Sequence, residues 1–248
     1  MRFVILHYHF LKNAGMSIES MLHRSFGSRF CSIDTAGRDG HVTEEMLLDR
    51  LGRDPLLQAV SSHQIRYPVP CVRGFMFYDL CFLRDPLDRI RSMHDYFREK
   101  PQEGDPVSDF ANRFPLGGFV ANLIEEMPWY IHDAQVNLLA NGIANDIPAP
   151  GDFERAVSRM LRTSFLGVVD KFHESVVAGE HFLRQVFPTL DCTMETENVS
   201  EGRAGELREA CEPAVYAELV RITSCDVKLV ELARAEVIRR FTLTRSWH

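Results

Sequence analysis

Short apolar stretches and longer stretches of helical period alternate along most of the chain. Residues 2–9 are brief, largely apolar and without helical period, which predicts a buried strand. From Gly15 to Phe26 apolar side chains recur at helical spacing, and Gly27 is typical of the position just after a helix. The chain therefore begins with a strand, a short loop and a helix.

The same alternation continues toward the C-terminus. Further brief apolar stretches predict strands at residues 59–63, 78–83 and 164–169. Stretches of helical period predict helices at residues 43–51, 85–99, 132–141, 153–163 and 171–187, and over most of the chain after residue 205, with a break at Pro213. Because strands separated by helices are typical of a parallel sheet covered on both faces, we expect an α/β fold, with residues 1–248 in one domain.

Residues 101–130 interrupt this pattern. They combine prolines and glycines with scattered aromatic residues, among them Trp129 and Tyr130. Such a composition predicts irregular structure with short helices. A segment of this kind commonly carries the variation that sets selectivity.

Composition and charge narrow the class of function. The formal net charge of −7 argues against general binding to nucleic acid or to an anionic membrane. No apolar stretch approaches the ~20 residues that cross a bilayer, and residues 2–8 are too short for a signal peptide. The six cysteines show no ligand spacing with each other or with histidine, which indicates reduced thiols and no metal centre. We therefore expect a cytoplasmic protein without an integral membrane segment.

The segment between the first predicted strand and helix has the composition of an anion site. Residues 9–18 read H-F-L-K-N-A-G-M-S-I. A helix N-terminus offers unpaired N–H groups, and the small residues Ala14 and Gly15 let the backbone approach a phosphate closely. Lys12 adds a positive charge to the same loop. The loop is not a Walker A motif, because its lysine precedes the glycine and no earlier glycine is present.

A second pattern suited to phosphate follows the strand predicted at 78–83. Arg84 ends this strand, and Asp85-Pro86 is a strong helix start, with aspartate as the N-cap and proline in the first turn. Ser92 follows about two turns into the helix. An arginine fork together with a hydroxyl group suits a phosphate dianion.

Both segments resemble motifs of the carbohydrate-type sulfotransferases, which include the heparan-sulfate 2-O-sulfotransferases and use 3′-phosphoadenosine 5′-phosphosulfate. The family's 5′-phosphosulfate loop, H-I-P-K-T-G-G-T-S-L, is matched at His9, Lys12, Gly15 and Ser17. The chain departs from that loop at Asn13, Ala14 and Met16. Met16 lacks a hydroxyl group that would touch the 5′-phosphate, so backbone N–H groups must replace that contact. The resemblance implies a P-loop-like three-layer fold in which residues 12–17 hold the 5′ end of the donor.

The second segment is similar to the family's 3′-phosphate motif, L-R-D-P-x-x-R-x-x-S. The resemblance implies that Arg84 and Ser92 hold the 3′-phosphate. For Arg89 we expect a structural ion pair, with a contact to phosphate as the alternative. Weaker similarities occur at residues 165–176, 198–203 and 225–233. The second of these stretches resembles a polar loop that closes over the nucleotide. The resemblance implies that its residues contact the adenine or the ribose, and these residues are Asn198, Ser200 and Arg203.

The resemblance implies transfer of a sulfuryl group from 3′-phosphoadenosine 5′-phosphosulfate to a hydroxyl-bearing acceptor. The acceptor class is a carbohydrate, a glycolipid or a small metabolite, and adenosine 3′,5′-bisphosphate is the leaving product. Lys12 would stabilise negative charge on the bridging oxygen, and no metal is required. Residues 101–130 would form an insertion on the acceptor side.

A general base should take the proton of the acceptor hydroxyl, and His63 is the main candidate. It ends the second predicted strand, and 2-O-type members of the family carry a catalytic histidine in a similar position. The alternative is that His63 packs at the strand end or only orients the substrate. His94 and His132 are lesser candidates for the base. Residues that could line an acceptor pocket, or simply fill the core, are Arg66, Tyr67, Trp129 and Tyr130.

Two other functions remain open on the sequence. A P-loop-like nucleotide kinase fits the fold, although the Walker lysine and an evident magnesium-binding aspartate after a strand are missing. A non-catalytic nucleotide-binding protein of the sulfotransferase fold would bind the bisphosphate without turnover, and Met16 favours this alternative.

Overall fold

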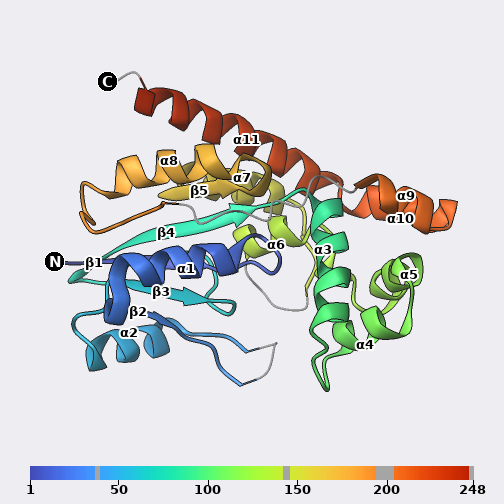
Figure 1. Ribbon diagram of the computed structural model, residues 1–248, viewed down its shortest axis with the longest axis horizontal. Coiled ribbons are helices and arrows are strands. Elements are labelled where there is room, and N and C mark those ends of the chain that lie inside the picture. The colour runs from blue at the N-terminus through green and yellow to red at the C-terminus, as the bar shows by residue number, and fades with distance from the viewer. Residues whose placement is uncertain (37–39, 142–145, 194–203, 246–248) are drawn as a thin grey trace.

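A computed structural model describes residues 1–36, 40–141, 146–193 and 204–245 (Figure 1). Its centre is a five-stranded sheet with the strand order β2-β3-β1-β4-β5, and every described pair of neighbouring strands is parallel. The strands are β1 (Arg2–Tyr8), β2 (Phe30–Ser32), β3 (Ala59–Ser62), β4 (Phe75–Leu83) and β5 (Phe165–Val168). The expected α/β class, with a parallel sheet between helical layers, is confirmed.

Helices cover both faces of this sheet, which explains why β1 is apolar on both sides. Ile5 lies in a buried cluster with side chains of α1 (Gly15–Phe26) and α8 (Phe172–Leu183). Val4 and Leu6 point to the opposite face, because successive strand residues alternate in direction. The helices on that face are α2 (Glu44–Arg53), α6 (Ala134–Ala140), α7 (Asp152–Arg162) and α11 (Ser224–Arg245).

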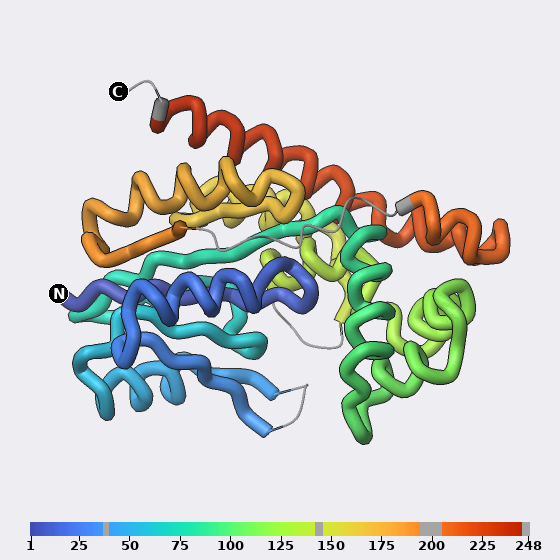
Figure 2. Tube along the Cα trace, in the orientation of Figure 1, coloured from blue at the N-terminus to red at the C-terminus, as the bar shows by residue number. Residues whose placement is uncertain are grey.

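A third apolar cluster joins a group of helices beyond the carboxyl ends of the strands, as the trace in Figure 2 shows. The helices in this group are α3 (Pro86–Glu99), α4 (Pro106–Arg113), α5 (Leu116–Glu126), α9 (Ala204–Ala210) and α10 (Pro213–Ile222). Short 3-10 turns are η1 (Gly27–Arg29), η2 (Pro128–Tyr130) and η3 (Val169–Lys171). Across the described residues, every helix is too short or too polar to cross a membrane.

Residues 101–130 are more regular than their composition predicts. Two helices, α4 and α5, occupy most of this segment. Val107, Phe119 and Leu123 are fully buried in the third apolar cluster. The short helices expected in this segment are confirmed, whereas irregular structure is confined to the connections around them, because packing against α3 and α10 outweighs the prolines and glycines.

The strand order places a topological switch point between β1 and β4. From β1 the chain passes through α1 toward β2, whereas from β4 it passes through α3 and continues to β5 on the other side of the sheet. The loops after these two neighbouring strands therefore lead in opposite directions. In open parallel sheets, ligands bind at this position, outside the carboxyl ends of the strands.

Candidate functional site

The loop between β1 and α1 brings an open helix N-terminus to the carboxyl edge of the sheet. Lys12 and Ala14 have left-handed backbone φ angles of 64° and 61°, which are costly in residues other than glycine. The first helical hydrogen bond runs from Ile18 N to Ala14 O at 3.2 Å. Helical geometry thus leaves the N–H groups of residues 15–17 without a partner inside the helix. Within the described chain no side chain caps α1, so its N-terminus has the form of an anion site.

Gly15 and His9, two residues of the predicted 5′-phosphosulfate loop, lie directly against each other. A Cβ atom at Gly15 would lie 1.8 Å from two ring atoms of His9, so this position requires glycine. The His9 ring is fixed from two other directions: Nδ1 lies 3.2 Å from Oε1 of Glu19, and the ring lies 3.7 Å from that of His63. His9 therefore supports the loop from within the fold.

Two cationic residues lie at this loop: Lys12, in the loop itself after β1, and Arg84, directly after β4. Nη1 of Arg84, which follows β4, donates a hydrogen bond to Lys12 O at 3.2 Å. The ammonium group of Lys12 lies 4.1 Å from the ring centroid of Tyr96 on α3. Burial, and next the charge of Arg84, lower the pKa of Lys12. A bound anion would offset this repulsion, so Lys12 and Arg84 together favour an anionic ligand.

The helix α3 carries the other residues of the predicted 3′-phosphate motif. Asp85 caps it, accepting hydrogen bonds from Leu87 N and Asp88 N at 2.9 and 3.2 Å. Ser92 is half-buried one turn before Tyr96, on the same helix face, because residues four apart are neighbours on a helix surface. It therefore lies on the side of α3 that the Lys12 ammonium approaches.

Arg89 is buried and has a structural role. It donates hydrogen bonds to Tyr130 O and, at 3.5 Å, to Leu11 O. Burial lowers the pKa of Arg89, and the charge of Asp226 opposes this shift. The sequence predicts an ion pair for Arg89, whereas its hydrogen bonds within the described chain run to backbone carbonyl groups.

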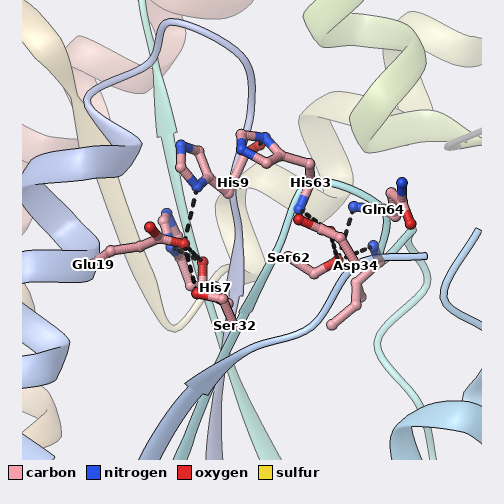
Figure 3. Close-up of polar contacts among 10 residues, drawn as sticks. His7, His9, Glu19, Ser32, Asp34, Ser62, His63 and Gln64 are labelled. Atoms are coloured by element: carbon pink, nitrogen blue, oxygen red, sulfur yellow. Dashed lines mark hydrogen bonds and ion pairs between the residues drawn. The ribbon is translucent and has the colours of Figure 1, made fainter. Parts of the chain in front are cut away.

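His63 directly follows β3, next to the ring of His9 (Figure 3). Its Nδ1 lies 2.8 Å from His9 O, and a carbonyl only accepts, so Nδ1 carries the proton and Nε2 has the free lone pair. Its backbone N–H donates to Oδ1 of Asp34 at 3.0 Å. The pKa of His63 is lowered, mainly by burial of the ring and to a smaller extent by the charge of His9. A neutral ring with an available Nε2 is the form that a general base requires.

A partly buried polar cluster lies against α1 and includes the rings of His7 and His9 together with Glu19, Ser32 and Ser61 (Figure 3). Oε1 of Glu19 accepts hydrogen bonds from Ser61 at 2.6 Å and Ser32 at 3.1 Å, and the hydrogen bonds from His9 and Ser61 hold the pKa of Glu19 at about 2 despite partial burial. His7 Nδ1 lies 2.9 Å from Ser61 Oγ, and burial keeps its pKa well below the usual value. These contacts already occupy Oε1 of Glu19.

The same cluster is the part of the described chain that could hold a metal ion. Ligand atoms of His7, His9 and Glu19 lie within 4.8 Å of one another. Sequence spacing does not indicate this group, because His7 lies in β1, His9 in the following loop and Glu19 in α1. The hydrogen bonds to Glu19 give the cluster an internal role without a metal.

The remaining predicted residues divide between the site, the core and the helical group. Arg66 donates hydrogen bonds to the carbonyl groups of His63 and Ile65 and so lies beside the candidate base. Tyr67 is a core residue, stacked on Tyr8 with ring centroids 3.9 Å apart. His94 is buried against Phe119, away from the loop. Residues that fall outside the described part of the chain are Asn198, Ser200 and Arg203.

The sequence did not single out four residues that hold the site together. Asp34, Glu19 and Tyr96 contact the predicted residues, and Gln135 is fully buried behind them. For Gln135 a signal was present, because it is a polar residue among apolar ones in the helix predicted at 132–141. The others lie on ordinary polar positions and give no signal in the sequence.

Fold and site together define an α/β protein with a candidate anion site and a candidate base at its switch point. No family model matches the chain. An uncharacterized protein of Archaeoglobus fulgidus is 25% identical to it over 245 residues, which cover 93% of this chain and 95% of that protein. The similarity thus extends over nearly the whole length of both chains and carries no assigned activity.

Proposed function

We propose that this protein is a sulfotransferase that moves a sulfuryl group from 3′-phosphoadenosine 5′-phosphosulfate to a hydroxyl acceptor. The observation that carries the proposal is the meeting of the α1 N-terminus, Lys12 and Arg84 at the switch point, beside a neutral His63. The fold is of the expected class, and both motifs converge on the same edge of the sheet. The six free cysteines suit the reducing cytoplasm as its location.

The residues present fit the two anionic ends of this donor. The N–H groups of residues 15–17 would bind the 5′-phosphate, since Gly15 lets the backbone approach and no Cβ fits there. Met16 is 73% exposed, so its side chain leaves the backbone accessible. Arg84 and Ser92 would bind the 3′-phosphate. No metal is needed to neutralise charge, because Lys12 and Arg84 supply two cations.

The proposed reaction exchanges one sulfur–oxygen bond for another. The acceptor oxygen forms a bond to sulfur as the bond from sulfur to the bridging oxygen breaks, and adenosine 3′,5′-bisphosphate leaves. His63 Nε2 takes the proton of the acceptor hydroxyl. Lys12 stabilises the negative charge that grows on the bridging oxygen. Positioning and charge stabilisation are the main sources of catalysis in such in-line transfers.

The acceptor that best fits the charge of the protein is neutral and small. A net charge of −7 disfavours a long polyanion, while Arg66 beside His63 offers one local cation. A carbohydrate, a glycolipid headgroup or another small metabolite with an accessible hydroxyl group is therefore the proposed acceptor class.

Ligand-dependent thermal stability provides the first test. Adenosine 3′,5′-bisphosphate should raise the melting temperature more than adenosine 5′-monophosphate or ATP with magnesium does, because a ligand of the native state stabilises it by mass action. Arg84→Ala should weaken bisphosphate binding about 10- to 100-fold, as expected for loss of a charge-assisted hydrogen bond. Arg234→Ala is the matched control, since it removes only a surface ion pair with Asp170.

The outcomes separate the three candidate functions. A larger shift with ATP and magnesium would favour a nucleotide kinase instead. Bisphosphate binding without transfer of label from radioactive donor to any acceptor in a broad hydroxyl panel would favour a non-catalytic nucleotide-binding protein. Binding together with transfer supports the sulfotransferase.

A further inference from the structure

Gln135 is fully buried, and its side-chain amide makes hydrogen bonds to both loops of the candidate site and, at 3.4 Å, to Asp226 Oδ2. It lies in the first turn of α6, and its exposed fraction is 0%. Oε1 accepts hydrogen bonds from Arg84 N at 2.9 Å and from Asn13 Nδ2 at 2.8 Å. Nε2 donates to Arg84 O at 2.8 Å. A single side-chain amide therefore contacts residues far apart in the sequence.

The orientation of this amide follows from its partners. A backbone N–H only donates and a backbone carbonyl only accepts, so the Arg84 contacts fix which end of the Gln135 amide is oxygen. Both backbone polar groups of Arg84 are thus paired directly after β4 ends at Leu83. The Gln135 amide bonds to the backbone of Arg84 as the backbone of a neighbouring strand would, and these two hydrogen bonds fix the position of Arg84.

The same oxygen holds the loop after β1. Asn13 Nδ2 donates to Gln135 Oε1 and also to Phe82 O, the latter at 2.8 Å. Asn13 is 2% exposed and directly precedes Ala14, whose backbone is left-handed. This side chain therefore anchors the turn that presents the first N–H groups of α1.

We propose that Gln135 is a positioning residue that sets the separation between the 5′ and 3′ halves of the anion site. One half is the α1 N-terminus, tied to Gln135 through Asn13, and the other is Arg84, tied through its backbone. The identity of the ligand rests on the proposed function, whereas the bridging contacts do not. The bridge adds to two direct hydrogen bonds between the same segments, from Asn13 Nδ2 to Phe82 O and from Arg84 Nη1 to Lys12 O.

The test compares Gln135→Met with Asn137→Leu. Methionine has nearly the shape of glutamine but lacks its hydrogen bonds. Asn137 is 4% exposed in the same helix and donates to Asp146 O at 2.9 Å, away from both loops. Each substitution removes buried polar contacts from α6, so both should lower the melting temperature.

The two variants should differ in nucleotide discrimination. Wild type should prefer adenosine 3′,5′-bisphosphate to adenosine 5′-monophosphate in calorimetric titrations, because only the former spans both halves. In Gln135→Met this preference should fall about tenfold, the effect of losing a hydrogen bond in the positioning contact. Asn137→Leu should keep the wild-type ratio. An unchanged ratio in Gln135→Met would overturn the proposal.

Hydrogen exchange supplies a readout that does not depend on any nucleotide. Amides of residues 13–17 should exchange faster in Gln135→Met than in Asn137→Leu at equal overall stability. If wild type binds no bisphosphate, the proposed function fails, and equal exchange in the two variants then refutes the bridge as well. Should Gln135→Met fail to fold, Gln135→Asn serves in its place, since it keeps a neutral amide but is one methylene shorter and so loses the contacts that join both loops.

Discussion

At the scale of single residues, the candidate base is defined by one hydrogen bond. The carbonyl of His9 fixes the Nδ1 proton of His63, and the neutral ring then has its lone pair on Nε2. This geometry is independent of the family resemblance, and it supplies the lone pair that the proposed role of His63 as a base requires. His94 lacks such a position, because its ring is buried in the helical group.

We predict that His63→Gln lowers kcat about 10²- to 10⁴-fold, the usual contribution of a general base, and leaves bisphosphate affinity unchanged. Protonated His63 cannot accept a proton, so activity should fall as the pH decreases through its pKa. Because burial lowers that pKa from the usual value, the loss should begin below pH 6.5. A pH–rate profile measures this limb. An acidic limb that persists unchanged in His63→Gln would assign the base to another residue.

At the scale of elements, the first residue of α1 carries both a packing and a functional constraint. We predict that Gly15→Ala destabilises the fold by about 1–3 kcal/mol, because its Cβ would displace a His9 ring held by Glu19 and His63. Bisphosphate affinity should fall with it. Urea unfolding and calorimetric titration measure the two effects.

Gly52→Ala is the control for this substitution. Gly52 lies within α2, and a Cβ there would meet nothing within 4 Å in the described chain. The substitution should raise stability by up to about 1 kcal/mol through helix propensity. Equal effects of the two substitutions would show that the His9 contact is unimportant.

Elements with clear local signals were predicted from the sequence. Asp85-Pro86 marks the start of α3 within one residue, and Gly27 marks the end of α1. The strand β2 was missed, because three residues are too few to show a period. Its register with β3 nevertheless matters, since it aligns Ser32 with Ser61 beneath Glu19. Contacts of this kind depend on strand order, which local pattern does not encode.

The site follows the same division. The sequence motifs already included Lys12, Gly15 and Arg84, because each of them lies near a strand end or a helix start whose neighbouring residues form a recognisable pattern. Gln135 joins them only through the packing of α6 against the carboxyl edge. Its role depends on distances between segments that are remote in sequence, and a single sequence does not supply these distances.

At the scale of the whole molecule, the C-terminal helix is connected to the site through buried carboxylates. Asp226, on α11, accepts hydrogen bonds from Gln135 N at 3.2 Å and Val136 N at 2.8 Å, which caps α6. In return Asp133 accepts from Cys225 N at 2.9 Å and Asp226 N at 2.8 Å, at the start of α11. Each helix start is thus satisfied by a side chain from the other. The chain beyond residue 224 therefore holds Gln135, and through it Arg84, in place.

This arrangement predicts a pH-dependent stability that a single substitution removes. Burial raises the pKa of Asp226 to about 6, above the usual 3.8. A carboxyl that binds its proton more tightly when folded contributes stability at low pH and loses it as the pH rises from about 4 to 6. Asp226→Asn has no such titration, so the stability difference between wild type and variant should shift by on the order of 2–3 kcal/mol between pH 4 and pH 7. Urea unfolding at both pH values measures the shift, with Asp191→Asn, at an exposed aspartate whose pKa is lowered instead, as the control of opposite sign. A pH-independent difference would mean that the charge of Arg89 fully offsets the effect of burial on the pKa of Asp226. The link between α11 and the site would then be insensitive to pH.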